Sequence, residues 1–166
     1  MAVIVRAATA SDMDAIAHIY AHHVNLGTGT FETEPPDSSE MGRRWSEVHA
    51  RSLPWLVAED AGDVVGYAYA GPYRPRLAYR HTVEDSIYVR ADRQGSGIGR
   101  LLMPALIDAS KGCGMHQMIA VIGDSGNRAS IHLHRRFGFE DAGLLKDVGF
   151  KFGRWLDTVF MQRSLL

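Results

Sequence analysis

The chain has 166 residues, of which 46% are hydrophobic, and a formal net charge of −1 at pH 7. This length suits one domain, residues 1–166, that can bury a sizeable core. The balanced charge argues against nucleic-acid binding, and no apolar run approaches the ~20 residues of a membrane span.

Hydrophobic periodicity and turn residues divide the chain into alternating helices and strands. The expected elements, in chain order, are a strand at 2–8, a helix from 11 to about 27, a loop at 28–37, a helix at 38–48, hairpin strands at 54–58 and 64–70, a strand at 81–90, a helix at 98–109, a strand at 115–122, a helix at 127–136, and strands at 139–145 and 155–163. Ser11 and Asp14 resemble a capping box for the first helix, and Ser38 or Ser39 can cap the second. Pro104 lies inside the third helix, where we expect a kink and not a break. This order predicts a mixed α/β sheet.

The glycine-rich segment between the strand at 81–90 and the following helix is the most informative part of the chain. Gly95, Gly97 and Gly99 alternate, so no Cβ blocks one side of the turn and backbone N–H groups can approach an anion. The helix adds its own free amides and the positive end of its dipole. A dinucleotide fingerprint needs glycine at Arg100, and no Gly-Lys-Ser/Thr of a P-loop occurs. The segment predicts a phosphate or pyrophosphate site, with an ordinary tight turn as the alternative.

Two motifs resemble those of the GCN5-related N-acetyltransferases. Gln94-x-x-Gly97-x-Gly99 resembles their coenzyme A pyrophosphate loop, and residues 127–139 resemble their second signature, Asn-x-x-(Ala/Ser)-x-x-Leu-(Tyr/His)-x-x-x-Gly-Phe. Many members have a tyrosine, the presumed general acid, where this chain has His134.

The histidine version of the second motif is similar to the phosphinothricin and methionine sulfoximine acetyltransferase branch, as are the segments at 31–35, 82–84 and 149–157. The resemblance implies the GNAT acyl-CoA N-acyltransferase fold, an α/β fold with a mixed central sheet of about seven strands flanked by about four helices. It also implies acetyl transfer from acetyl-CoA to the α-amine of a small amino-acid-like acceptor, such as L-methionine sulfoximine, L-methionine sulfone or phosphinothricin.

Acetyl transfer from a thioester to an amine requires the amine to lose a proton and favours protonation of the leaving thiolate. Glu84 begins the strand segment beside the expected cofactor arm, so it can act as general base if desolvation raises its pKa. Asp85 must point to the other face of the strand, so at most one of the two serves as base. His134 shares a helix face with Asn127 and Ser130 and titrates near neutrality, so His134 or a water molecule can protonate the thiolate.

The resemblance also places residues along the coenzyme. It places Ile87, Tyr88 and Val89 along the pantetheine, Gln94, Gly95, Ser96, Gly97, Ile98, Gly99 and Arg100 at the pyrophosphate, and Asn127 and Ser130 beside the arm. Asn127 can also act simply as the N-cap of its helix.

The acceptor class carries an α-carboxylate, which a guanidinium can bind with two hydrogen bonds. Arg74 is the preferred candidate, because it lies on the connection that leads to Glu84; Arg76 on the same connection is the alternative. Tyr73 and Tyr79 can shape the acceptor pocket or simply pack. Phe31, on the loop between the first two helices, can close over the acceptor or belong to the core.

The remaining expectations concern partners and location. We expect no metal site, because the adjacent His22 and His23 diverge on a helix and lack a carboxylate partner. Cys113 is the only cysteine, and the N-terminus lacks a signal-peptide pattern, which predicts a cytoplasmic protein. The family resemblance implies a homodimer with residues 151–155 near the shared surface. Alternative functions are a protein N-terminal or other amine acetyltransferase, or a non-catalytic acyl-CoA sensor.

Overall fold

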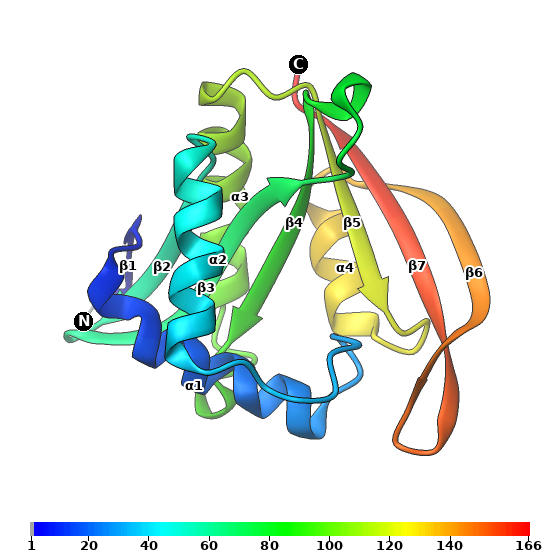
Figure 1. The fold of residues 1–166 in the computed structure, drawn as a ribbon, viewed down its shortest axis with the longest axis horizontal. Helices are drawn as coiled ribbons and strands as arrows, with labels where there is room; N and C mark the ends of the chain where they lie inside the picture. The colour runs from blue at the N-terminus through cyan, green and yellow to red at the C-terminus, as the bar shows by residue number, and fades with distance from the viewer. Residues whose placement is uncertain (1) are drawn as a thin grey trace.

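The computed structural model describes residues 2–166, which form one seven-stranded sheet covered by helices (Figure 1). The elements are β1 (Ile4–Ala7), α1 (Met13–Leu26), α2 (Ser38–Ala50), β2 (Trp55–Asp60), β3 (Asp63–Pro72), β4 (Thr82–Val89), α3 (Ile98–Gly112), β5 (Gln117–Gly123), α4 (Arg128–Arg136), β6 (Glu140–Lys151) and β7 (Arg154–Ser164), with short 3-10 turns at Ala10–Asp12, Leu77–Tyr79 and Ala91–Arg93. The expected mixed sheet of about seven strands with about four helices is confirmed. None of the helices in residues 2–166 is long and apolar enough to cross a membrane.

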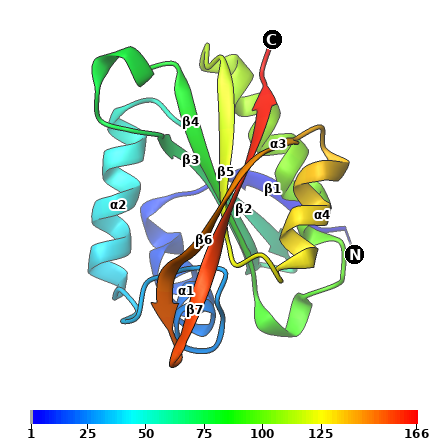
Figure 2. The same cartoon turned by 90° about the vertical axis from the view of Figure 1, so that its right-hand side faces the viewer.

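The helices cover both faces of the sheet. The strand order is β1-β2-β3-β4-β5-β7-β6, and α1 and α2 lie on one face while α3 and α4 lie on the other (Figure 2). Each face has its own buried cluster: one is built around Leu102 and Leu106 of α3, the other around Ile16 of α1, Met41 of α2 and Tyr67 of β3. The apolar stripes of the helices therefore pack where their periodicity predicts.

Both predicted helix caps are wrong by one or two residues. The Asp12 carboxylate, not Asp14, accepts a hydrogen bond from the Thr9 backbone N–H at 2.8 Å, because it also binds the guanidinium of Arg6 at 2.8 Å. A 3-10 turn consequently precedes α1. At α2 the cap is Asp37, whose Oδ1 accepts from the backbone N–H of Glu40 at 2.8 Å.

The other helix and strand boundaries agree closely with those predicted from the sequence, with one exception. Helix α3 continues through Pro104, as expected. Strand β6 is longer than predicted and runs to Lys151, with register shifts between Asp141 and Gly143 and between Leu145 and Gly149. These irregularities interrupt the alternating pattern from which the end of a strand is recognised in sequence.

The sheet divides between β4 and β5, the one parallel strand pair within residues 2–166. These strands pair only from Thr82 to Glu84 on β4, opposite residues 117–119 of β5. Beyond Glu84, β4 continues beside β3 while β5 continues beside β7, and the two strands diverge (Figure 1). The edge of β4 from Asp85 to Val89 is therefore unpaired on the β5 side, and the candidate site lies there.

Candidate active site

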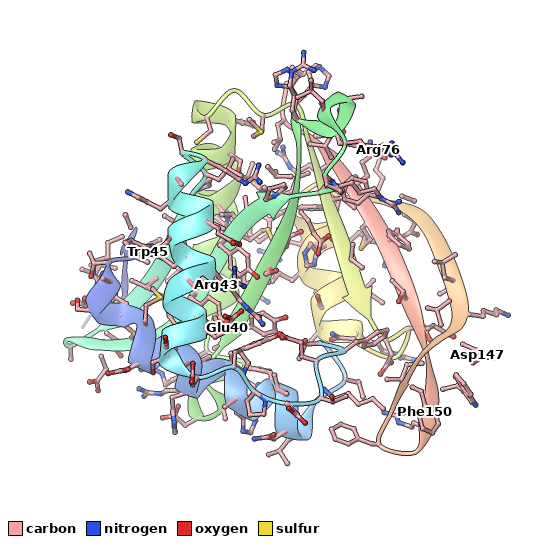
Figure 3. The ribbon with its side chains drawn as sticks, in the orientation of Figure 1. Glu40, Arg43, Trp45, Arg76, Asp147 and Phe150 are labelled. Carbon is pink, nitrogen blue, oxygen red and sulfur yellow. The ribbon has the colours of Figure 1, made fainter. Side chains whose placement is uncertain are left out.

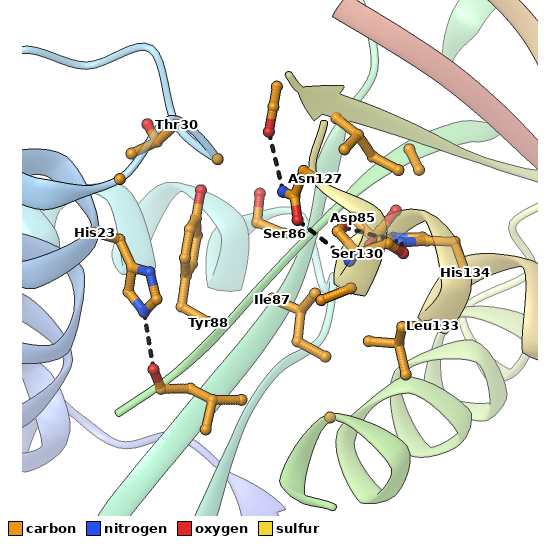
Figure 4. Close-up of a pocket in the computed structure, with 18 of the residues that line it drawn as sticks. His23, Thr30, Asp85, Ser86, Ile87, Tyr88, Asn127, Ser130, Leu133 and His134 are labelled. Atoms are coloured by element: carbon orange, nitrogen blue, oxygen red, sulfur yellow. Dashed lines mark hydrogen bonds and ion pairs between the residues drawn. The ribbon is translucent and has the colours of Figure 1, made fainter. Parts of the chain in front are cut away.

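The divergence of β4 and β5 opens a cleft of about 1360 Å³ (Figure 4). Its walls come from four segments that are far apart in the sequence. They are the free edge of β4 (residues 84–89), the glycine loop (residues 93–100), the end of β5 with the start of α4 (residues 120–134), and residues 27–32 of the loop between α1 and α2. The glycine loop and Glu84, which the sequence assigned to different tasks, therefore open onto one cavity.

The glycine loop has the geometry of an anion site. Gly95 and Gly97 have φ values of 75° and 89°, which favour glycine, and a Cβ on either would meet no atom within 4 Å. Gly97 is the N-cap of the 15-residue helix α3, whose first amides lack intrahelical acceptors. Gly99 differs: a Cβ there would lie 3.2 Å from Cδ2 of Leu133, so this glycine allows α3 and α4 to approach closely.

Glu84 has the environment expected of a general base. It is partly buried at the point where β4 leaves β5, opposite Gly71 of β3. Burial raises the pKa of its carboxyl to about 7, and the negative charge of Asp85 adds to the rise. A carboxylate with this pKa accepts a proton effectively near neutral pH.

His134 does not present a free ring nitrogen to the cleft. Its Nε2 lies 2.7 Å from Oδ2 of Asp85, and its Nδ1 lies 2.7 Å from the backbone oxygen of Ser130. The side chain is 3% exposed. His134 is among the residues that line the cleft, but direct proton donation to a leaving thiolate would require one of these contacts to break, so this role stays a prediction. As predicted from strand alternation, Asp85 projects from the face of β4 opposite Glu84 and reaches α4.

Asn127 caps α4 and joins it to β5. Its Oδ1 accepts from the Ser130 backbone N–H at 3.3 Å, and its Nδ2 donates to the Gly123 carbonyl at 3.0 Å. The capping role is confirmed. Asn127 and Ser130 line the cleft, but their contact with a cofactor arm stays a prediction.

Ile87, Tyr88 and Val89 also line the cleft, and their surroundings differ. The ring of Tyr88 packs edge-on against Tyr20 with centroids 4.9 Å apart. The carbonyl oxygen of Val89 lies 2.8 Å from Nε2 of His23. Figure 4 marks this contact of His23 with a dashed line. His23 therefore contacts the free edge of β4, a role that sequence reasoning missed. Within residues 2–166 no three metal-binding side chains come together.

The predicted acceptor residues occupy two separate places. Phe31 lines the cleft, with the two edges of its ring against Gly123 of β5 and Gly149 of β6. Tyr73, Arg74 and Tyr79 lie outside the cleft lining, on the exposed connection between β3 and β4 that also carries Arg76 in Figure 3. There the Arg74 guanidinium stands 5.2 Å from the Tyr73 ring centre, and the Tyr73 and Tyr79 rings meet edge to face.

A polar network that the sequence did not reveal holds the loop between α1 and α2 in place. Arg44 of α2 lines the cleft and binds both carboxylate oxygens of Glu32, at 2.7 and 3.0 Å. The Tyr20 hydroxyl contacts Glu32 and the Thr30 hydroxyl. The buried ammonium of Lys151 donates to the Thr30 carbonyl at 2.9 Å. Lys151 and Thr30 are 121 residues apart, so no local pattern indicates their contact.

Comparison with known proteins gives a consistent result. The sequence pattern described as the acetyltransferase (GNAT) family matches residues 16–139. The chain is 55% identical over 161 residues to a phosphinothricin N-acetyltransferase of Alcaligenes faecalis, a match that covers 97% of this chain and 82% of that protein. It is 46% identical over 167 residues to an L-methionine sulfoximine/L-methionine sulfone acetyltransferase of Pseudomonas paraeruginosa, covering 99% of this chain and 96% of that one.

A solved structure has the same fold over the whole chain. It is that of a putative acetyltransferase from Salmonella typhimurium with its cofactor acetyl-CoA, and the TM-score is 0.97 at 40% sequence identity. The match covers 100% of this chain and 95% of that one. Sequence and fold therefore agree over nearly the whole chain.

Proposed function

Because this chain belongs to the acetyltransferase (GNAT) family, we propose that it transfers the acetyl group of acetyl-CoA to the α-amine of a small amino-acid-like acceptor. The acceptor class is that of L-methionine sulfoximine, L-methionine sulfone and phosphinothricin, for which the two similar enzymes are named. One observation carries the proposal: an anion loop and a carboxyl with a pKa of about 7 open onto the same cleft.

The described residues fit acetyl-CoA as donor. The open backbone at Gly95 and Gly97 and the first amides of α3 suit its pyrophosphate, and the free edge of β4 suits its extended arm. When bound, acetyl-CoA supplies the thioester whose acetyl group is transferred. We propose a cytoplasmic location, since this donor is an intracellular metabolite.

Glu84 accepts the proton that the acceptor amine loses as it attacks, directly or through a water molecule. Tyr69 on β3 and Arg44 on α2 also line the cleft, and the phenol of Tyr69 lies within electrostatic reach of both Glu84 and Arg44. The loop between α1 and α2 forms one wall of the cleft, where Phe31 and Thr30 are both held against β6. A wall held in this way suits a small acceptor better than a peptide, which needs an open groove.

A steady-state acceptor screen with acetyl-CoA tests this function. Methionine sulfone, methionine sulfoximine and phosphinothricin are compared with peptides that carry a free N-terminal amine. We expect turnover of the three small acceptors. Turnover of the peptides alone would favour a protein N-terminal acetyltransferase, and acetyl-CoA binding without turnover of any amine would favour a sensor.

We further propose that Arg74 binds the acceptor carboxylate. The connection that carries it starts just beyond Gly71, the register partner of Glu84, so Arg74 follows three residues after the β3 position that faces Glu84. Arg74→Ala should raise the KM for a carboxylate acceptor about 10-fold with little change in kcat. Steady-state kinetics with an acceptor and its methyl ester measure this, because the ester KM should not respond.

The matched control for this prediction is Arg80→Ala on the same connection, since the Arg80 guanidinium already donates to the Leu77 carbonyl. Equal KM increases in both variants would indicate a general effect of positive charge. A loss confined to kcat would contradict carboxylate binding by Arg74.

We also propose a homodimer formed through β6 and β7. Large apolar side chains are exposed along these strands and their connecting turn; they are Leu144, Leu145, Val148, Phe150, Phe152 and Trp155. Phe150 points away from the sheet at the end of this hairpin (Figure 3). Exposed apolar groups of this extent commonly mark a protein interface.

The dimer predicts a mass in light scattering of twice the 18.3 kDa of one chain. Trp155→Glu should reduce the mass to that of one chain, since a charge cannot be buried at an apolar interface without a partner. Leu77→Glu, at an exposed site on the connection between β3 and β4, is the control and should leave the mass unchanged. A wild-type mass of 18.3 kDa would refute the dimer.

A further inference from the structure

A buried side-chain hydrogen bond joins β4 to α4 where the sheet divides. The side chains of Asp85 and His134 are 1% and 3% exposed, and their Oδ2 and Nε2 atoms are 2.7 Å apart (Figure 4). Asp85 is the first residue of β4 beyond its pairing with β5. The contact therefore replaces strand pairing at this point and fixes α4, with Asn127 and Ser130, beside the free edge of β4.

The hydrogen-bond partners of His134 restrict where its protons lie. The Ser130 carbonyl can only accept, so Nδ1 must carry a hydrogen. If Asp85 is ionised, it too can only accept, and His134 is then a doubly protonated imidazolium. Burial acts to lower the pKa of His134, but the charge and hydrogen bond of Asp85 outweigh it and the pKa is raised. The raised pKa favours the doubly protonated form of His134, whose Nε2 then donates to Asp85.

The surroundings of Asp85 leave its charge only partly compensated. Among residues 2–166, Oδ1 of Asp85 is buried and has no hydrogen-bond partner. Glu84 is the next residue on the same strand, and the negative charge of Asp85 raises its pKa. A charge in a dry interior acts on its neighbours more strongly than a charge in water.

We propose that Asp85 is a positioning residue for the transfer reaction: its contact with His134 holds α4 against β4, and its carboxylate sets the electrostatic environment of the adjacent Glu84. This inference rests on the proposed function of Glu84 as base. In this proposal the Asp85–His134 pair positions α4 and acts on Glu84, and His134 does not donate a proton to the leaving thiolate.

The groups that face Glu84 limit the alternatives. On β4 itself the neighbouring charge is Asp85, and on β3 the phenol of Tyr69 is electrostatically coupled to Glu84. On β5 the register partner is the apolar Ile119. From α4, the His134 imidazolium acts from the far side of Asp85. Asp85 is therefore the charge whose removal should move the titration of Glu84 most.

Asp85→Asn removes the charge of Asp85 but keeps its hydrogen bond to His134, which is the tether between β4 and α4. An asparagine amide can donate to Nε2 of a neutral His134, whose Nδ1 hydrogen stays on the Ser130 carbonyl, so the hydrogen bond persists without the charge. Asp85→Ala removes both. Asp141→Asn is the matched control, because Asp141 is an exposed acid paired with Arg135 on the surface.

The first measurement is the ¹³C NMR titration of the Glu84 carboxyl. In Asp85→Asn its midpoint should move to lower pH by about half a unit or more, and in Asp141→Asn it should not move. An unchanged midpoint in Asp85→Asn overturns the electrostatic role. The titration needs no turnover, so it stays decisive even if every acceptor fails and the proposed function is wrong.

The second measurement tests the tether. The ¹⁵N spectrum of His134 at pH 7 should show both ring nitrogens protonated in the wild type and only Nδ1 protonated in Asp85→Asn. The KM for acetyl-CoA should stay within about twofold in Asp85→Asn and rise about 10-fold in Asp85→Ala. Equal KM values in all three proteins overturn the tether, and if Asp85→Ala does not fold, the two Asp85→Asn spectra decide the proposal.

Discussion

Replacing Glu84 with glutamine is expected to lower kcat by about 100-fold or more while the affinity for acetyl-CoA changes little. Glutamine keeps the size of the side chain but cannot accept the proton of the attacking amine. The residues proposed to hold the coenzyme, at the glycine loop and along β4, are unchanged in this variant. A non-catalytic acyl-CoA sensor would need no such carboxylate, so the same variant separates the enzyme from that alternative.

The pH dependence of the wild-type enzyme is a second test of Glu84 as the general base. Since burial raises the pKa of Glu84 to about 7, kcat/KM should rise with pH as this carboxyl loses its proton near pH 7. Glu84→Gln should lose that dependence together with its activity. The measurement is kcat/KM from pH 5.5 to 9, with exposed Glu140 changed to glutamine as the matched control. An unchanged rate in Glu84→Gln would remove this residue from the mechanism.

Stability gives an independent control on the Glu84 variant. A carboxyl whose pKa is higher in the folded state than its ordinary 4.5 stabilises the fold fully below pH 4.5, and this contribution is lost as pH rises through about 7. Glutamine avoids burying that charge. The melting temperature of Glu84→Gln at pH 8 should therefore be at least that of the wild type, and a large decrease would mean that the activity loss reflects unfolding.

The features that sequence reasoning identified are those encoded locally. Alternating glycines next to a helix start predict the anion loop, because backbone geometry and helix dipole depend only on neighbours. The opposite orientation of Glu84 and Asp85 follows from the alternation of a strand. The spacing of Asn127, Ser130 and His134 follows from the helix period.

The features that sequence reasoning missed depend on contacts between distant segments. The sequence does not show that Asp85, 49 residues earlier, contacts Nε2 of His134. The sequence does not single out Arg44, because nothing near α2 indicates that its guanidinium binds Glu32. Asp12, not Asp14, is the capping residue because its carboxylate also binds the Arg6 guanidinium. Each of these is a tertiary contact that overrides a plausible local pattern.

Gly149→Ala should destabilise the fold by about 1–3 kcal/mol, a typical cost of overpacking, because a Cβ there would lie 2.4 Å from Cε2 of Phe31. Gly149 has no positive φ, so alanine meets no backbone strain and the cost comes from the ring alone. Phe31 must move, and with it the cleft wall that the loop between α1 and α2 forms. We therefore expect a lower melting temperature and a higher acceptor KM, while the KM for acetyl-CoA stays nearly constant.

A double-mutant cycle with Phe31→Ala identifies the cause of this loss. Phe31→Ala alone removes the ring's contacts, but it also leaves space for a methyl group at position 149. Adding Gly149→Ala to Phe31→Ala should then cost little, and the two changes should be strongly non-additive. Gly112→Ala in α3 is the control, because a Cβ there meets no atom within 4 Å and alanine favours the helix. Additive losses in the cycle would show that Gly149 serves the strand and not the ring, and that Phe31 does not position the loop.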